Sequence, residues 1–309
     1  MQNKICVIGA SNVDITGFTK EKLVYKDANI GSMKTSPGGV GRNIAENLHS
    51  LGLEVDFISV FGDDPLSQYI MNSCKDLELK ITNSLFLKDA HAATFIAVMD
   101  ENNDLAVGIS AMNIYNDISK DFIVSKLSVI DKADFVVLET NMPEETLKTI
   151  VTELPNKKYI LDTVSGKKTL KASSILQNLY ILKTNLLEAQ MLSNIEVNND
   201  TDLEKIVQFF INKGVKNVFI TLGENGVIYG NNNIIKKQEA IVSEVVNTIG
   251  AGDAFLSGVV YGDILNKDIH EVARYGMACA GINVRHDSAV SPDMKHKYIL
   301  QMLETGIYF

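Results

Sequence analysis

The sequence predicts an α/β fold in which a mainly parallel β-sheet lies between helices. Short apolar runs alternate along the chain with segments of helical periodicity, and this order is typical of parallel strands joined by helical crossovers. The composition agrees, because the 309 residues are 46% hydrophobic and 22% charged, with 21 glycines and only 5 prolines. Such values are typical of a folded globule rather than a disordered or collagen-like chain.

The first expected strand covers residues 4–8, a short apolar run followed by Gly9. A helix is expected from Gly41, because Ile44, Leu48 and Leu51 have helical spacing, and Gly52 closes it. A second clear helix covers residues 202–213. Further strands of the main sheet are expected at residues 55–60, 135–138, 159–161, 180–182 and 218–222.

Two segments interrupt this alternation. Residues 94–99 and 105–109 are rich in β-formers and are joined by a polar stretch, which predicts a hairpin. With residues 28–33 they can build a small sheet that stands off the main one as a lid. We therefore expect one domain over residues 1–309, with a lid formed by inserted segments at about 12–36 and 91–113.

The net charge of −9 and the pI near 5.1 argue against a surface for nucleic acid or anionic lipid, and favour a small-molecule partner. The three cysteines are far apart, so neither a disulfide framework nor a zinc site is expected. No apolar run approaches the ~20 residues that span a bilayer, and the start does not resemble a signal peptide. We expect a cytoplasmic protein with no membrane contact.

The sharpest local motif is residues 247–253, Asn-Thr-Ile-Gly-Ala-Gly-Asp. After the apolar pair Val245–Val246, it predicts a strand that enters a turn of small residues and opens a helix, whose first N–H groups would hold an anion. Asp253 would lie in the first helical turn, where it can take a proton from an incoming hydroxyl. Alternatively, Asp253 only complements the helix dipole and the glycines only permit a tight turn.

A second glycine cluster, at residues 36–43, also precedes a helix. Gly38 and Gly39 would let the backbone approach a ligand, and Asn43 can donate and accept hydrogen bonds. With Asn12 and Asp14, which follow the first strand, the cluster could hold a sugar diol at the edge where open α/β sheets bind ligands. The alternative is a plain loop with a solvated Arg42.

Two weaker motifs follow. Asn185 and Glu188 have a spacing that can hold waters around Mg²⁺, and it is also the spacing of a helix capping box. Thr221, Gly223 and Gly226 end an expected strand, where they could line a nucleotide or only form a turn. The sequence has no Walker phosphate loop, no protein-kinase catalytic loop, no H-E-x-x-H metal motif and no G-x-S-x-G elbow.

In this order, from residue 8 to 253, the motifs resemble those of the ribokinase-like, or PfkB, carbohydrate kinases. The resemblance implies a ribokinase-like three-layer α/β sandwich with a mainly parallel central sheet and a small β-sheet lid. It also implies that Asp253 is the catalytic base. The anion hole would come from Gly250, Ala251 and Gly252, and the sugar would be bound by Gly38, Gly39 and Asn43.

The same resemblance implies ATP and Mg²⁺ as cofactors. Asn185 and Glu188 match the family's N-x-x-E motif and would hold Mg²⁺ through water. Activation by a monovalent cation such as K⁺ would involve a loop near Asn247 and Ile249. The nucleotide would be lined by Thr221, Gly223 and Gly226.

Within the family, residues 9–15, 37–48, 112–114 and 162–165 are most similar to the branch that phosphorylates the nucleoside pseudouridine. This implies transfer of the γ-phosphate of ATP to the nucleoside's 5′-hydroxyl. The substrate would contact Asn12, Asp14, Asn113 and Lys168. Departures from the usual pattern are Ser67, where glycine is common, Thr163 and Thr184, where proline is common, and residues 110–111, where Ser-Ala replaces an asparagine–aspartate pair.

Two alternatives stay open. One is another kinase of this family that acts on ribose, uridine, adenosine or a related sugar or nucleoside. The other is a catalytically silent nucleoside sensor, which would not need the base Asp253. Because a lid sheet has exposed edges, we also expect a homodimer that pairs the two lids.

Overall fold

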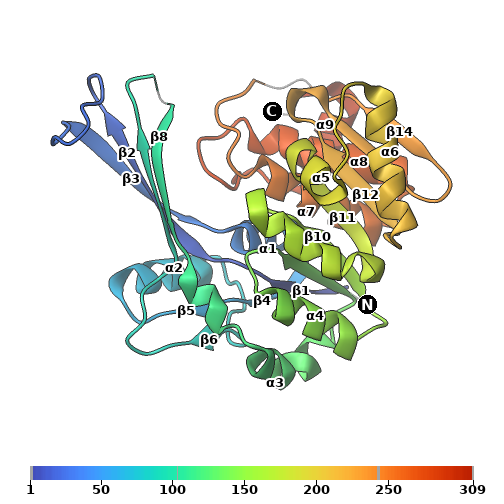
Figure 1. The fold of residues 1–309 in the computed structure, drawn as a ribbon, viewed down its shortest axis with the longest axis horizontal. Helices are drawn as coiled ribbons and strands as arrows, with labels where there is room; N and C mark the ends of the chain where they lie inside the picture. The colour runs from blue at the N-terminus through green and yellow to red at the C-terminus, as the bar shows by residue number, and fades with distance from the viewer. Residues whose placement is uncertain (1–2, 103, 242–243, 308–309) are drawn as a thin grey trace.

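The computed structural model describes residues 3–102, 104–241 and 244–307. Its centre is an eight-stranded sheet in the order β14-β13-β12-β11-β10-β9-β1-β4 (Figure 1). The parallel strands are β1 (Lys4–Ile8), β4 (Glu54–Ile58), β9 (Phe135–Glu139), β10 (Lys158–Asp162), β11 (Leu179–Asn185) and β12 (Asn217–Thr221). The mainly parallel sheet is confirmed. Two antiparallel strands that the sequence analysis did not expect, β13 (Val227–Gly230) and β14 (Ile235–Gln238), complete one edge.

Helices cover both faces of this sheet. In β1, Ile5 and Val7 pack into one buried cluster and Cys6 and Ile8 into the other, as the alternation of a strand buried on both sides requires. The first cluster includes side chains of α1 (Val40–Ser50), α2 (Pro65–Asp76), α7 (Ala251–Ile264), α8 (Ile269–Asn283) and α9 (His296–Thr305). The second includes α3 (Lys120–Ile130), α4 (Glu144–Glu153), α5 (Leu186–Ser193) and α6 (Asp200–Asn212). The result is a three-layer α/β sandwich.

Short elements complete the main body. They are the two-stranded sheet of β5 (Val60–Phe61) and β6 (Leu85–Phe86) and the 3₁₀ turns η1 (Asn113–Asp117), η2 (Gly166–Ser174), η3 (Leu176–Asn178) and η4 (Gly223–Asn225). All three cysteines are buried and unpaired. Within the described ranges, no helix is both long and apolar enough to cross a bilayer.

The helix expected at residues 202–213 is α6. Its stripe of Leu203, Ile206 and Phe210 is buried against the sheet, and Gly214, at φ +105°, ends it. The helix begins two residues earlier than expected, because the side chain of Asn199 caps it by accepting from the Asp202 amide at 3.1 Å.

A four-stranded sheet, which we call the lid sheet, projects from the main body (Figure 1). Its order is β3 (Gly31–Gly38), β2 (Asn12–Thr19), β7 (Thr94–Met99) and β8 (Leu105–Ala111). The strand expected at residues 28–33 actually begins at Gly31, because Asn29 closes a turn by accepting from the Val24 amide and donating to the Val24 carbonyl. β3 then pairs with β2 along its whole length and ends at Gly38, directly before α1.

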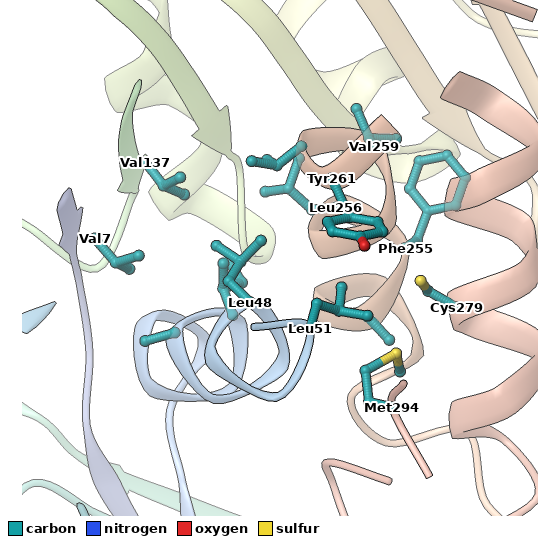
Figure 2. Close-up of a cluster of buried hydrophobic side chains, with 14 of the residues drawn as sticks. Val7, Leu48, Leu51, Val137, Phe255, Leu256, Val259, Tyr261, Cys279 and Met294 are labelled. Carbon is teal, nitrogen blue, oxygen red and sulfur yellow. The ribbon is translucent and has the colours of Figure 1, made fainter. Parts of the chain in front are cut away.

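Helices α1 and α7 pack against each other through buried apolar side chains. Figure 2 shows Leu48 of α1 and Leu51, which directly follows α1, in one buried cluster with Leu256 and Tyr261 of α7 and Val7 of β1. α8 packs closely against α7, since a Cβ at Gly258 would lie 2.4 Å from the Tyr275 carbonyl oxygen. This packing sets the relative position of the first turns of α1 and α7.

Candidate active site

The two glycine motifs lie 210 residues apart in sequence and meet in the structure. The amide Nδ2 of Asn43, in the first turn of α1, donates to Oδ2 of Asp253, in the first turn of α7, at 2.8 Å. Both side chains are buried. Each helix begins after a glycine with positive φ, Gly39 at +104° and Gly250 at +77°, and neither glycine can supply a capping side chain. The N-termini of α1 and α7 therefore face the same region of the molecule.

The first turn of α7 has free amides. The Ala251 amide donates to the Thr248 carbonyl at 3.2 Å, whereas those of Gly252 and Asp253 have no hydrogen-bond partner in the described part of the chain. Gly250 must be glycine, because a Cβ there would lie 1.9 Å from the Ala289 carbonyl oxygen. These N–H groups, at the positive end of the helix dipole, can hold an anion.

The strand expected to precede this turn is not formed. Val245 and Val246 are 61% and 58% exposed, and no neighbouring strand in the described ranges pairs with them. Instead, the Val246 amide donates to the Val284 carbonyl just after α8 at 2.8 Å. That prediction was wrong because an apolar pair becomes a strand only where a partner strand is within reach.

Asp14 faces the start of α1. Its Oδ1 accepts from Asn12 Nδ2 at 2.6 Å, and a Cβ at Gly38 would lie 2.1 Å from its Oδ2. Burial raises the pKa of Asp14 to about 6, although the Asn12 hydrogen bond and the charge of Arg42 oppose this. Close to the pair with Asp253, the buried Oδ1 of Asn43 has no partner in the described chain, so it remains available to a ligand hydroxyl.

Arg42 is not a solvated loop residue. It is 3% exposed, and its Nη1 pairs with Oε2 of Glu46 at 2.9 Å, one turn along α1. The alternative of a plain loop is therefore wrong for Arg42, because burial of the first turn of α1 takes its guanidinium out of water.

Three charged residues at or near the ends of adjacent strands were not chosen as site residues from the sequence. Glu139, Asp162 and Lys183 lie in one row across β9, β10 and β11. Lys183 Nζ pairs with Oδ2 of Asp162 at 2.9 Å, and both side chains are buried. A Cβ at Gly252 would lie 2.8 Å from this Nζ, so the ammonium lies directly beneath the anion turn. A charged residue directly after an apolar run is the sequence signal that could have found them.

Burial raises the pKa of Asp253 to about 7, and the charge of Asp162 adds to the effect. Lys183 and the hydrogen bond from Asn43 work in the opposite direction. For Lys183, burial lowers the pKa, but the neighbouring carboxylates outweigh it and the net direction is upward. The site therefore holds a charged ammonium beside a carboxyl that titrates near neutral pH, which suits a base for a hydroxyl proton.

Asn185 and Glu188 form the capping box of α5, so that alternative is confirmed. The Asn185 side chain accepts from the Glu188 amide at 2.9 Å, and Oε2 of Glu188 accepts from the Asn185 amide at 3.1 Å. Thr163 and Thr184, the two departures from proline, also donate to Oε2 of Glu188, at 2.5 and 3.3 Å. Among the described residues, no three acidic, histidine or cysteine side chains gather at one metal position.

The residues expected to line a nucleotide end the strand next to Asn185. Thr221 is paired in register with Asn185, and η4 follows with Gly223 at φ +61° and Gly226 at +87°. Asn247 folds back on its own loop, where its Oδ1 accepts from the Ile249 amide at 3.0 Å. The Ile249 carbonyl accepts from Nδ2 of Asn283 at 2.9 Å.

In the described part of the chain, Lys168 and Asn113 make no hydrogen bond with Asn43 or Asp253. Lys168 Nζ donates to Oδ1 of Asn141 at 2.5 Å and lies 3.8 Å from Sδ of Met112, while Asn113 begins η1 and is exposed. Glu139 supports this region, since its carboxylate accepts from the Asn141 amide at 2.7 Å.

This arrangement can be compared with known proteins. The model of the pfkB family of carbohydrate kinases matches residues 2–296, nearly the whole chain. The chain belongs to this family. The family's fold is confirmed by a putative sugar kinase from Clostridium perfringens, whose crystal structure has a TM-score of 0.86 and 29% identity, with 98% of this chain and 96% of that one covered.

Two relatives indicate the range of substrates in this kinase family. Pseudouridine kinase from Escherichia coli is 29% identical, with 98% of this chain and 97% of the relative covered. Ribokinase from Staphylococcus aureus is 26% identical, with 94% and 96% covered. As a PfkB kinase with a ribokinase-like fold, the protein is a phosphotransferase that acts on a sugar or nucleoside hydroxyl, and kinases of this family use ATP.

Proposed function

We propose that this kinase transfers the γ-phosphate of ATP to the 5′-hydroxyl of pseudouridine. The observation that carries the proposal is the Asn43–Asp253 pair at the open start of α7, with Asp14 at the start of the lid sheet. The groups that we propose as base, anion site and sugar-binding carboxylate thus lie in one region. The similarity to pseudouridine kinase over almost the full length supports the choice of substrate.

In the proposed reaction, Asp14, Asn12 and Asn43 hold the ribose. The free Oδ1 of Asp253 accepts the proton of the 5′-hydroxyl, since its Oδ2 accepts from Asn43. The hydroxyl oxygen forms a bond to the γ-phosphorus as the bond to the β-phosphate oxygen breaks, and ADP leaves. The amides of Gly252 and Asp253 and the ammonium of Lys183 stabilise the charge on the transferring group.

Cations complete the proposal. The Glu188 carboxylate accepts four hydrogen bonds within the protein, so it fits a Mg²⁺ held through water better than one bound directly. When bound, Mg²⁺ would neutralise phosphate charge. We propose that Asn185 and Glu188 hold Mg²⁺ through water. Thr221, Gly223 and Gly226 would line the nucleotide, and the loop with Asn247 and Ile249 would bind a monovalent cation.

The pKa of Asp253 predicts the pH dependence. Its carboxyl must be ionised to accept a proton, so kcat/KM for the nucleoside should fall about tenfold per pH unit below pH 7. Rates from pH 5.5 to 9 with saturating ATP measure this acid limb. A profile that stays flat down to pH 5.5 contradicts the assignment of Asp253 as the base.

The substrate is tested by ADP release with pseudouridine, uridine, cytidine, adenosine, ribose and fructose. We expect the highest kcat/KM with pseudouridine. Equal kcat/KM with uridine would indicate a general nucleoside kinase. A preference for ribose would indicate a ribokinase, the alternative that the S. aureus relative supports. If none of these acceptors increases ATP consumption, the protein is the catalytically silent nucleoside sensor.

We also propose that the chain is one domain whose lid sheet pairs with that of a second copy. Register places exposed Met33, Ile96, Val107 and Ile109 on the lid face opposite Asp14. Burial of this apolar face would drive association.

Light scattering at micromolar concentration should give twice the chain mass of 34.0 kDa. Ile109→Asp should give a monomer, because it places a charge in the proposed interface. Val124→Asp, at an exposed valine of α3, is the matched control and should remain a dimer. A monomeric unmodified protein rules the interface out.

A further inference from the structure

One row of the lid sheet runs across all four strands and contains Asp14. The register pairs Ser36 of β3 with Asp14 of β2, Asp14 with Phe95 of β7, and Phe95 with Ser110 of β8. Side chains paired in register share a face, and strands are ~4.8 Å apart. Phe95 and Ser110 therefore follow Asp14 at successive strand spacings on the same face.

This face is the one turned toward the main body. Lys34, one row further out, lies on this face too. Its register partner is Thr16, which is two residues after Asp14 on β2 and therefore on the same side of the sheet. Lys34 Nζ reaches Oδ2 of Asp287, in the segment after α8, at 3.0 Å. A ligand held by Asp14 would thus lie between this face and the ends of the main-sheet strands.

The ring of Phe95 reaches toward β8. A Cβ at Gly108, in the next row of β8, would lie 3.4 Å from both Cε2 and Cζ of Phe95. The ring therefore extends across β8 over a position that has no side chain, and it is only partly buried. An aromatic ring in the row of Asp14 can offer apolar surface to a ligand that Asp14 holds.

The direction from Asp14 to Phe95 leads away from the base. Asp253 is hydrogen-bonded to Asn43 of α1. This helix follows β3, the strand on one side of Asp14. Phe95 and Ser110 lie on the other side, and β8 leads on to Met112, next to Lys168. A ribose whose 5′-hydroxyl meets Asp253 would turn its C1′ substituent toward β7 and β8.

We propose that Phe95 and Ser110 recognise the nucleobase: the base stacks on the Phe95 ring, and its polar edge bonds with the Ser110 hydroxyl. This inference rests on the proposed nucleoside kinase function and adds the residues that distinguish a nucleoside from a bare sugar.

A purely structural role for Phe95 is the competing explanation, because an aromatic side chain can shield a glycine on a neighbouring strand. The two roles differ in what they change. Loss of shielding lowers stability and affects all substrates equally. Loss of a stacking partner raises the KM for the nucleoside and leaves the KM for ATP and the rate of ATP hydrolysis without acceptor unchanged.

The test compares Phe95→Leu, Ser110→Ala and the control Phe18→Leu with the unmodified protein. Phe18 lies on the same face of β2, two rows beyond Asp14. For Phe95→Leu we expect the KM for pseudouridine to rise about 5- to 100-fold, the range of one base–aromatic stack. Ser110→Ala should raise it less, and Phe18→Leu should change it less than twofold.

A pseudouridine KM within twofold of the unmodified value in Phe95→Leu overturns the inference, as does an equal rise in Phe18→Leu. If Phe95→Leu melts at a much lower temperature, Ser110→Ala at an exposed position decides: an unchanged KM then overturns the inference. Failure of the proposed function is seen separately, because the unmodified protein would then phosphorylate no nucleoside in the panel.

Discussion

Asp253→Asn should lower kcat for the nucleoside by about 10²- to 10⁴-fold, because an amide cannot accept the hydroxyl proton. Binding should change little, since asparagine has nearly the same shape and its side-chain oxygen can still accept from Asn43 Nδ2. Steady-state ADP release at pH 8, with KM determined for both substrates, measures the effect.

The same variant should not lose stability. The raised pKa of Asp253 means that its ionised form is disfavoured in the folded protein, so this carboxylate lowers stability as the pH rises from about 4 through 7. A neutral asparagine removes that effect, and the melting temperature at pH 8 should stay equal or rise. Asp263→Asn, in the last turn of the same helix, is the control and should keep its kcat. If Asp253→Asn keeps more than a tenth of normal turnover, the base is another group.

Lys183→Met should lower the free energy of unfolding by about 3–5 kcal/mol, because it leaves the Asp162 carboxylate buried without its partner. The variant also removes the charge that lowers the pKa of Asp253, so the acid limb of the pH–rate profile should move to higher pH. Urea unfolding and the pH profile measure the two effects independently.

Two controls separate these effects from the loss of any lysine. Lys148→Met breaks an exposed pair with Glu144 on α4 and should leave the free energy of unfolding nearly unchanged, because water screens this pair. The double variant Asp162→Asn/Lys183→Met removes both buried charges and should recover part of the lost stability, since the oxygen of the introduced amide can still accept from the Val164 N–H. If Lys183→Met lowers the free energy of unfolding by less than about 1 kcal/mol, Lys183 does not compensate the buried charge of Asp162.

Local pattern predicted much of the fold. β1 has the expected bounds, and α6 has the expected apolar stripe and glycine stop, because helix periodicity, caps and short apolar runs are encoded by neighbouring residues. The antiparallel edge of β13 and β14 was not expected. The bounds of β3 and the loop at Val245 also differ from prediction, since strand formation depends on which partner is within reach.

The sequence alone determined which chemistry the chain carries: two glycine motifs before helices, with Asn43 in one and Asp253 in the other, in an order that resembles the family to which the chain belongs. Only the tertiary structure decided that Asn43 bonds Asp253 and that Lys183 lies beneath Gly252. The physical reason is distance along the chain. Parallel strands bring distant residues to one edge, and the register that decides which of them meet depends on packing across the whole sheet.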